Sequence, residues 1–323
     1  MRILVTGGAG FIGSHLCERL VARGDDVVAV DNFDPFYDPA VKRRNLAALE
    51  GSPRFRPVEG DVCEPEALDA ALGDAAFDVV VHLAARAGVR PSLERPLDYV
   101  RTNVEGTAAM LELARRRGTG AFVLGSSSSV YGDAAHVPFS ESDPVGRPIS
   151  PYAASKRGAE LLGHTYAHLY GMAVLCLRFF TVYGPRQRPD LAIHKFARLM
   201  LDGGEVPVYG DGTTERDYTY VDDIVQGVEG GIRWALAHPG AFEVMNLGES
   251  RTVSLAELLE LLSAALGVEP RIRRLPAQPG DVARTFANVD KARSLLGYDP
   301  RVPVEEGIRR FVRWLRDEGG GAA

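Results

Sequence analysis

Short apolar runs alternate with longer segments of helical periodicity through the first half of the chain. The runs that we expect to form strands are Arg2–Thr6, Asp26–Val30, Arg54–Val58, Asp78–Val81, Ala121–Leu124 and Ala173–Arg178. The segments with a helical pattern are Gly10–Arg23, Glu64–Leu72, Leu97–Arg117 and Pro151–Tyr170. Runs such as DVVAV are continuously apolar after their first residue, as in strands that are buried on both faces. The alternation predicts an α/β fold with a Rossmann-like, doubly wound parallel sheet.

The pattern changes after Arg178. Loops rich in glycine and proline appear, and helical patterns follow at Asp222–Ala237, Ser254–Leu266 and Val304–Arg316. We therefore predict a sheet domain over residues 1–178, a smaller C-terminal α/β portion over residues 179–316, and a tail over residues 317–323. Some segments of the smaller portion are expected to return to the sheet.

Composition narrows the possible functions. The 323 residues are 46% hydrophobic and 25% charged, which is typical of a globular protein with a sizeable core. A net charge of -6 disfavours nucleic acid or an anionic membrane as the main partner. No apolar run approaches the ~20 residues that cross a bilayer, and the first residues follow a strand pattern and not that of a signal peptide. The three cysteines are far apart, so we expect reduced thiols in a cytoplasmic protein.

The turn after the first expected strand is rich in glycine. TGGAGFIG (Thr6–Gly13) contains Gly7, Gly10 and Gly13. Glycines here permit a tight turn and a close approach to a pyrophosphate, and the following helix start offers free N–H groups. Asp31 ends the second strand, where a carboxylate binds a ribose 2′-hydroxyl and repels a 2′-phosphate. The pattern predicts an NAD site; the alternative is an ordinary tight turn with a solvated aspartate.

Tyr152 and Lys156 lie four residues apart in a helical pattern, so one face of the helix carries both. A tyrosine hydroxyl has a pKa of about 10 and is a weak base at neutral pH. A nearby ammonium group and the positive nicotinamide of NAD+ would lower that pKa and allow the tyrosine to remove a hydroxyl proton. Because the spacing is common, an exposed surface pair is the alternative.

Four serines, residues 126–129, follow the fifth expected strand in LGSSSSVYG. A flexible linker is one interpretation of such a run. A linker would interrupt the alternation of strands and helices, whereas the carboxyl edge of an open parallel sheet is where ligands bind. We therefore predict that the serines line an active site.

These motifs, together with HLAA (His82–Ala85) and RFFTVYGPRQRPD (residues 178–190), resemble the extended short-chain dehydrogenase/reductase family. Within it the chain resembles the nucleotide-sugar epimerases, and most of all the UDP-glucuronate 4-epimerases. The segments DNFDPFYDPAVKR, AGVRPSLERP and QPGDVARTFANVDKARSLLGY are similar to that subgroup. The resemblance runs from Met1 to about Arg316.

The resemblance implies an NAD that stays bound and is recycled. The positions that match NAD contacts of the family are Gly7, Phe11, Ile12, Asp31, Asn32, Asp61, Val62, Leu83, Ala84, Ala85, Ala87, Asn103 and Phe180, beside Gly10, Gly13, Tyr152 and Lys156. Taken by itself, Asp61 fits a helix cap as well as a contact to the adenine amino group.

The resemblance also implies the reaction of an isomerase. C4 of UDP-glucuronate is oxidised, the 4-keto sugar rotates, and re-reduction from the other face gives UDP-galacturonate, without a metal. Tyr152 matches the base and later acid, Lys156 matches the residue that holds the nicotinamide ribose, and Ser127 matches the partner of the sugar 4-hydroxyl.

A uronate substrate carries a hazard, because oxidation at C4 makes a β-keto acid that readily loses CO2. We hypothesise that Ser128, Ser129 and Thr181, with Arg188 nearby, hold the carboxylate out of alignment with the ketone. Related dehydratases and decarboxylases have an acidic residue at the position of Ser129, so its hydroxyl disfavours both reactions. The alternative is that these hydroxyls only cap or line the pocket.

Four more positions match contacts to the UDP portion. Arg216 matches an arginine on the diphosphate, Arg90 is a second candidate, and Val208 and Tyr209 resemble contacts to the uridine. The resemblance further implies a homodimer through the segment Leu97–Arg117 and the helix that carries the tyrosine base. Other readings are a 4-epimerase of neutral UDP-hexoses such as UDP-glucose or UDP-N-acetylglucosamine, a UDP-glucuronate decarboxylase, and a catalytically inactive NAD(H)-binding sensor.

Overall fold

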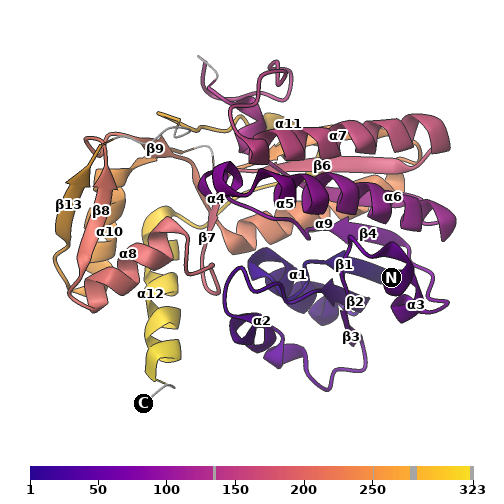
Figure 1. Cartoon of the computed structure of the whole chain (residues 1–323), viewed down its shortest axis with the longest axis horizontal. Helices are drawn as coiled ribbons and strands as arrows, with labels where there is room; N and C mark the ends of the chain where they lie inside the picture. Colours follow the sequence, from indigo (N-terminus) through magenta and orange to yellow (C-terminus); the bar gives the residue numbers. More distant parts are fainter. Residues whose placement is uncertain (134–135, 250, 277–281, 321–323) are drawn as a thin grey trace.

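One parallel sheet forms the centre of the molecule. The computed structural model describes residues 1–133, 136–249, 251–276 and 282–320, and within these ranges the large sheet has the strand order β11-β6-β5-β4-β1-β2-β3 (Figure 1). The bounds are β1 Arg2–Thr6, β2 Asp26–Asp31, β3 Phe55–Glu59, β4 Val79–His82, β5 Ala121–Ser127, β6 Ala173–Phe179 and β11 Phe242–Leu247. All neighbours run parallel, so their carboxyl ends meet at one edge. The predicted Rossmann-like α/β fold is confirmed.

Helices cover both faces of the sheet. Ile3 and Val5 of β1 belong to one buried core, to which α1 (Phe11–Arg23) and α9 (Val221–Ala237) contribute. Leu4, which points to the opposite face, belongs to a second core under α3, α6 and α7. The bounds of these three helices are α3 Pro65–Leu72, α6 Gly106–Arg116 and α7 Pro151–Tyr170. The alternation of side chains along each strand therefore fills two separate layers.

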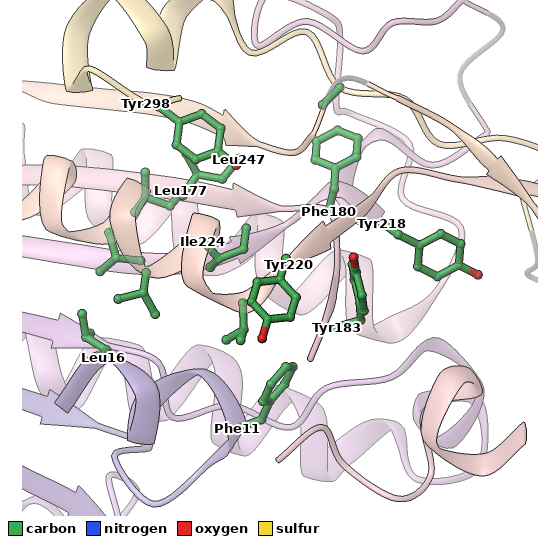
Figure 2. Close-up of a cluster of buried hydrophobic side chains, with 14 of the residues drawn as sticks. Phe11, Leu16, Leu177, Phe180, Tyr183, Tyr218, Tyr220, Ile224, Leu247 and Tyr298 are labelled. Carbon is green, nitrogen blue, oxygen red and sulfur yellow. The ribbon is translucent and has the colours of Figure 1, made fainter. Parts of the chain in front are cut away.

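The smaller portion lies at one side of the sheet (Figure 1). Its strand pairs are β7 Thr181–Tyr183 with β10 Tyr218–Tyr220, β8 Glu205–Tyr209 with β13 Arg271–Leu275, and β9 Glu215–Arg216 with β12 Val253–Ser254. Its helices are α8 Ala192–Leu201, α10 Leu255–Leu266 and α12 Val304–Gly320, whereas α11 Asp290–Leu296 packs against α9 and β11 of the large sheet. Figure 2 shows how the first core continues from the sheet into this portion, through Leu177, Ile224 and the ring of Tyr220.

Several elements differ from the sequence-based expectation. β5 continues three residues beyond Leu124, and β11, which was not predicted, pairs with β6 and so extends the sheet. The segment expected as one helix is interrupted by a π-helical turn, η2 (Arg101–Glu105), between α5 (Pro96–Val100) and α6. α12 continues four residues past its expected end, into the predicted tail. The last three residues of that tail lie outside the described ranges, and so do residues 278–281 at the start of the segment that begins with QPGD.

Candidate active site

The motifs predicted to carry the chemistry meet in a cleft at the carboxyl edge of the sheet. The cleft has a volume of about 500 Å³, which is in the usual range for a small-molecule site. Its walls are the turn after β1, the segments after β2, β3 and β4, the end of β5, the start of α7 and the segment after β6. A ligand in it would therefore touch most of the strand ends that the fold brings together.

The turn between β1 and α1 has little room for side chains. Gly7 adopts a φ of 69°, and a Cβ there would lie 2.8 Å from the backbone nitrogen of Ala84. A Cβ at Gly13 would clash with the carbonyl oxygen of Gly7. α1 begins at Phe11 without a side-chain cap or an acidic residue in its first turn, so its first N–H groups are open to an anion. This turn fits the pyrophosphate of a dinucleotide.

Asp31 is fixed at the end of β2, beside that turn. Its Oδ2 accepts a hydrogen bond from the backbone N–H of Ala9 at 3.2 Å, and its Oδ1 accepts one from Phe33 at 2.9 Å. The buried Lys42, on α2 (Pro39–Asn45), places Nζ 3.4 Å from Oδ1. Lys42 also lines the cleft. Sequence reasoning missed it, because only the packing of α2 brings this lysine to the carboxylate.

Asp61 has both of the features between which the sequence left a choice. Its Oδ1 accepts a hydrogen bond from the N–H of Cys63 at 2.8 Å, as in a turn cap, and its Oδ2 accepts one from Nδ2 of Asn32 at 3.0 Å. Burial raises the pKa of Asp61, but these hydrogen bonds outweigh it and hold the pKa below its ordinary value. Asp61 and Asn32 both line the cleft, so the turn also presents a charged carboxylate to a ligand.

Tyr152 and Ser127 lie close together in the cleft, with their hydroxyl groups in range of each other. α7 is capped by Ser150, whose Oγ accepts a hydrogen bond from the N–H of Ala153 at 3.1 Å, and this cap fixes the first turn that carries the tyrosine. Burial raises the pKa of Tyr152, whereas the hydrogen bond with Ser127 and the positive charge of Arg188 lower it. The pair can exchange a proton with a hydroxyl group placed between them.

Lys156 is buried and donates a hydrogen bond from Nζ to the carbonyl oxygen of Gly125 at 2.7 Å. Burial lowers the pKa of Lys156 to about 8, while the carboxylate of Glu160 raises it. Arg188 is a further positive group that lowers the pKa of Tyr152. The effect of the Lys156 ammonium group on Tyr152 stays a prediction.

The serine run forms regular structure, so the linker interpretation is wrong. Ser126 and Ser127 complete β5, and a 3₁₀ turn, η3 (Ser128–Tyr131), follows. The Oγ of Ser127 accepts a hydrogen bond from the N–H of Ser129 and donates one to its Oγ, both at 3.2 Å. Residues 126–129 all line the cleft.

Thr181 and Arg188 line the cleft from the segment after β6. Arg188 pairs with Asp190 through two hydrogen bonds of 2.9 and 2.7 Å and donates a third to the carbonyl oxygen of Ala87 at 3.1 Å. Its guanidinium group also lies 5.0 Å from the centre of the Phe36 ring. Arg188 is therefore a fixed positive group in the wall of the cleft, as expected for a residue near a substrate carboxylate.

Most of the predicted site residues line this one cleft. They are Gly7, Gly10, Phe11, Ile12, Gly13, Asp31, Asn32, Asp61, Val62, Leu83, Ala84, Ala85, Ala87, Ser127, Ser128, Ser129, Tyr152, Lys156, Phe180, Thr181 and Arg188. The residues that do not line it are Asn103, Arg90, Val208, Tyr209 and Arg216. The last four belong to the predicted UDP contacts, so the cleft unites the predicted catalytic residues and all predicted NAD residues except Asn103, but not the UDP set.

Asn103 lies behind the cleft wall. Its side chain accepts a hydrogen bond from the N–H of Arg86 at 2.8 Å and donates to the carbonyl oxygen of Arg86 and the hydroxyl of Ser155, both at 2.9 Å. It is 1% exposed. Because these bonds occupy its amide, Asn103 positions the segment after β4 in this structure and is not an open donor to a ligand.

The side chains of Arg90 on α4 (Val89–Glu94) and Tyr209 on β8 contact each other, although the two elements belong to different portions of the chain. The guanidinium of Arg90 lies 4.6 Å from the centre of the Tyr209 ring at the end of β8. Arg216 is half-buried on β9 and donates to the carbonyl oxygen of Glu215 at 2.8 Å. The contact between Arg90 and Tyr209 joins the sheet domain to the smaller portion.

A further set of cleft residues carries no sequence-based assignment. Asp34 forms an ion pair of 2.7 Å with Arg86, and Phe36 and Tyr37 lie in the same segment after β2. The sequence marked DNFDPFYDPAVKR only as similar to a subgroup, and gave no role to these side chains. Among the described residues, no group of three or more side chains is arranged to hold a metal, and no described helix is both long and apolar enough to cross a membrane.

The fold and the cleft define a dinucleotide-dependent enzyme. The chain belongs to the NAD dependent epimerase/dehydratase family, whose sequence profile matches residues 3–248. A UDP-glucuronate 4-epimerase of Thermodesulfobacterium geofontis is 40% identical over 315 residues, covering 97% of this chain and 96% of that protein.

Solved structures of similar fold include enzymes of two different reactions. The UDP-glucuronic acid 4-epimerase of Bacillus cereus, in complex with UDP-glucuronic acid and NAD, superimposes with a TM-score of 0.90 at 35% identity, covering 98% of this chain and 100% of that one. DesIV of Streptomyces venezuelae, a dTDP-glucose 4,6-dehydratase with NAD and TYD bound, has a TM-score of 0.91 at 35% identity, with 99% and 98% coverage. Fold similarity alone therefore does not separate the two reactions.

Proposed function

We propose that the chain catalyses the NAD-dependent C4 epimerisation of UDP-glucuronate to UDP-galacturonate. The observation that carries the proposal is the pair of Tyr152 and Ser127, which lies with Arg188 in a cleft built for a dinucleotide. The relative from T. geofontis and the complex from B. cereus support this substrate. The alternatives are a 4-epimerase of neutral UDP-hexoses and, less well supported, a UDP-glucuronate decarboxylase.

The residues of the chain have separate tasks in this reaction. Bound NAD supplies the oxidation and the re-reduction at C4. Tyr152 accepts the proton of the 4-hydroxyl and later returns it, and Ser127 holds the oxygen in hydrogen-bonding distance of the tyrosine. Lys156 orients the cofactor ribose, and its ammonium group is fixed by the hydrogen bond to the carbonyl oxygen of Gly125 at the end of β5. Because oxidation and reduction occur in the same site, the cofactor is NAD+ again at the end of each cycle and can stay bound.

Ser128, Ser129 and Thr181 are proposed to bind the substrate carboxylate, with Arg188 nearby. All four line the cleft, and the hydroxyl of Ser129 is held by Ser127 at 3.2 Å. A serine at this position supplies no acid for elimination, which disfavours the dehydratase reaction of DesIV. Arg216, Arg90, Val208 and Tyr209 are proposed for the UDP portion, which would then extend from the cleft toward β8 and β9.

The first test is incubation of the purified protein, without added NAD, with UDP-glucuronate or UDP-glucose. The products are separated and identified by NMR. We expect UDP-galacturonate with little loss of CO2. Conversion of UDP-glucose alone would refute the uronate specificity, and a UDP-pentose as main product would refute the epimerase proposal in favour of a decarboxylase.

The carboxylate set is tested by Thr181→Val. Loss of a hydrogen bond to a charged group should raise KM for UDP-glucuronate by about tenfold or more and increase the UDP-pentose side product. UDP-glucose, which has no carboxylate, is the internal control. An equal change for both sugars would show that Thr181 only shapes the cleft.

We also propose that the protein acts as a homodimer in the cytoplasm. Apolar side chains on neighbouring helices support the dimer: Leu97 on α5 is 79% exposed, and Leu161 and Leu169 on α7 are 53% and 60% exposed. Leu161 and Leu169 are eight residues apart and so lie on one side of α7. The free thiols of Cys17, Cys63 and Cys176 suit a reducing compartment.

A further inference from the structure

A buried ion pair lies behind the catalytic residues and has no role in the reaction described above. The side chains of Glu160, on α7, and Arg178, on β6, are 0% and 2% exposed. Arg178 donates from Nε to one carboxylate oxygen at 2.8 Å and from a terminal nitrogen to the other at 2.9 Å. Burial raises the pKa of Glu160, but the hydrogen bonds and charge of Arg178 outweigh it and keep the carboxyl ionised. Since desolvation largely offsets the attraction of buried pairs, stability alone is a weak reason for this one.

The pair belongs to the contact between α7 and the end of β5. Three residues at four-residue intervals on α7, Tyr152, Lys156 and Glu160, each contact one of the last three residues of β5. Tyr152 lies in range of the Ser127 hydroxyl, Lys156 donates to the carbonyl oxygen of Gly125 at 2.7 Å, and Glu160 accepts from the hydroxyl of Ser126 at 2.7 Å. Glu160 is therefore the third contact in a row whose first two members are catalytic.

Arg178 connects this contact to two further elements. In the sheet it is the register partner of Ser126, so both side chains reach Glu160 from adjacent strands. Its guanidinium lies 4.8 Å from the centre of the Tyr131 ring in η3. The hydroxyl of Tyr131 in turn donates to Asn246 on β11 at 2.7 Å. The strand end that carries the serines is thus held from the helix, the neighbouring strand and the turn that follows.

The carboxylate also affects the charge of Lys156. Among the groups around this lysine, Glu160 on the same helix is the acid that raises its pKa. The thiol of Cys176 on β6 is buried, which raises its pKa, so it is neutral. His82 on β4 is buried and its pKa is lowered to about 3, so it is neutral. The other charged partner of Glu160 besides Arg178 is Arg157, at 2.8 Å. Without the carboxylate, Lys156 would lose the acid that raises its pKa.

We propose that Glu160 is a positioning residue for the epimerisation. Its carboxylate, held by Arg178, fixes Ser127 against the helix that carries Tyr152 and balances the charge of Lys156. The inference rests on the proposed 4-epimerase activity. It assigns no contact with substrate or cofactor to Glu160.

The test is the double variant Glu160→Gln, Arg178→Gln, which removes both buried charges together and so avoids leaving one unpaired. The intact protein is assayed with UDP-glucuronate and with UDP-glucose. We expect kcat to fall about tenfold or more while KM stays within about threefold. The decline of kcat at alkaline pH should also begin at lower pH than in the wild type, because Lys156 loses its acid partner and gives up its proton more readily. Bound NAD and thermal unfolding are measured on the same samples.

Glu229→Gln is the matched control. Glu229 is a buried acid on α9 that pairs with Arg19 and Arg23 of α1 at 3.2 and 3.3 Å, away from α7. We expect it to lower stability but to leave the pH dependence of kcat unchanged. A folded double variant with the kcat and alkaline decline of the wild type would overturn the proposal.

If the double variant does not fold, Ser126→Ala carries the test. This variant removes only the hydroxyl group from which Glu160 accepts a hydrogen bond. We expect kcat to fall about threefold or more, with KM and NAD content little changed. An unchanged kcat would overturn the proposal. The substrate preference of the wild type reports separately on the proposed function. Conversion of UDP-glucose alone would refute the uronate assignment and still allow the ratio of variant to wild-type kcat to judge Glu160.

Discussion

The proton transfer depends on a single hydroxyl group, that of Tyr152. Replacement of this residue by phenylalanine should lower kcat by about 10³-fold, because no other group near the sugar oxygen can take the proton. Bound NAD should remain, since the ring still fills its place. The change in kcat is measured by NMR of the product, and NAD content by release from denatured protein.

Tyr99→Phe is the matched control for that change. Tyr99 is buried, its ring centre lies 6.0 Å from that of Tyr152, and its hydroxyl donates to the carbonyl oxygen of Ala87 at 3.3 Å. It should keep kcat within about threefold of the wild type. Full activity of Tyr152→Phe would instead support an inactive NAD(H)-binding sensor.

The pH profile should report on Lys156. Burial lowers the pKa of Lys156 to about 8, so the ammonium form predominates below that pH and is lost above it. We expect kcat/KM, which reflects the free enzyme, to decline as the pH rises through about 8. Lys156→Met should be slow at every pH and show no such decline. A profile that stays flat through pH 10 in the wild type would contradict this assignment.

The residues that sequence reasoning predicted are those whose spacing along the chain decides their position. The glycines, Asp31, Tyr152 and the serines are of this kind, and they meet in the cleft. Lys42 and the pair of Glu160 with Arg178 are different, because their partners lie on other elements and only tertiary packing brings them together.

At the scale of elements, the tight packing of the turn from β1 to α1 leads to a prediction about NAD binding. Gly13→Ala should weaken NAD binding at least about tenfold, because the added Cβ meets the carbonyl oxygen of Gly7 and must push the turn away from its position. NAD binding is measured by titration after removal of the bound cofactor. Gly120→Ala, where a Cβ meets no atom within 4 Å, is the control and should bind NAD as the wild type does. Equal binding by both variants would show that the turn tolerates a side chain.

The elements themselves could be predicted where their apolar pattern is unbroken. β1, β2, β4, β5 and β6 are of this kind over most of their length, whereas β3 (FRPVE) is interrupted by Arg56 and Pro57. β11 was missed because Glu243 and Asn246 interrupt the run, although its residues pair in full with β6. The π-helical turn η2 leaves no trace in the periodicity, since the residues on either side remain helical. Within α6, a Cβ at Gly106 would come 2.8 Å from Val62, a tertiary contact that no local pattern contains.

For the whole molecule, the arrangement of the two portions explains why the predicted UDP set lies apart from the cleft. The residues predicted to bind the cofactor mostly follow strand ends, so the sheet fixes their positions. Arg216, Val208 and Tyr209 lie on short strands outside it, and the stacking of Arg90 on Tyr209 is a contact between the two portions. Such a contact depends on how the portions pack, so a sequence pattern can assign the residues only through resemblance.

The subunit arrangement is tested by Leu97→Glu combined with Leu161→Glu. These leucines lie on α5 and α7, which pack against each other (Figure 1). Both of their side chains are exposed, and together they define an apolar surface on these two helices. Burial of that surface in a homodimer would be disrupted by two carboxylates, so light scattering should give twice the chain mass of 34.9 kDa for the wild type and the single mass for the variant. Leu295→Glu, at a side chain that is 46% exposed on α11, is the control and should remain dimeric. A monomeric wild type, or a variant that still dimerises, would mean that this apolar surface does not form the subunit interface.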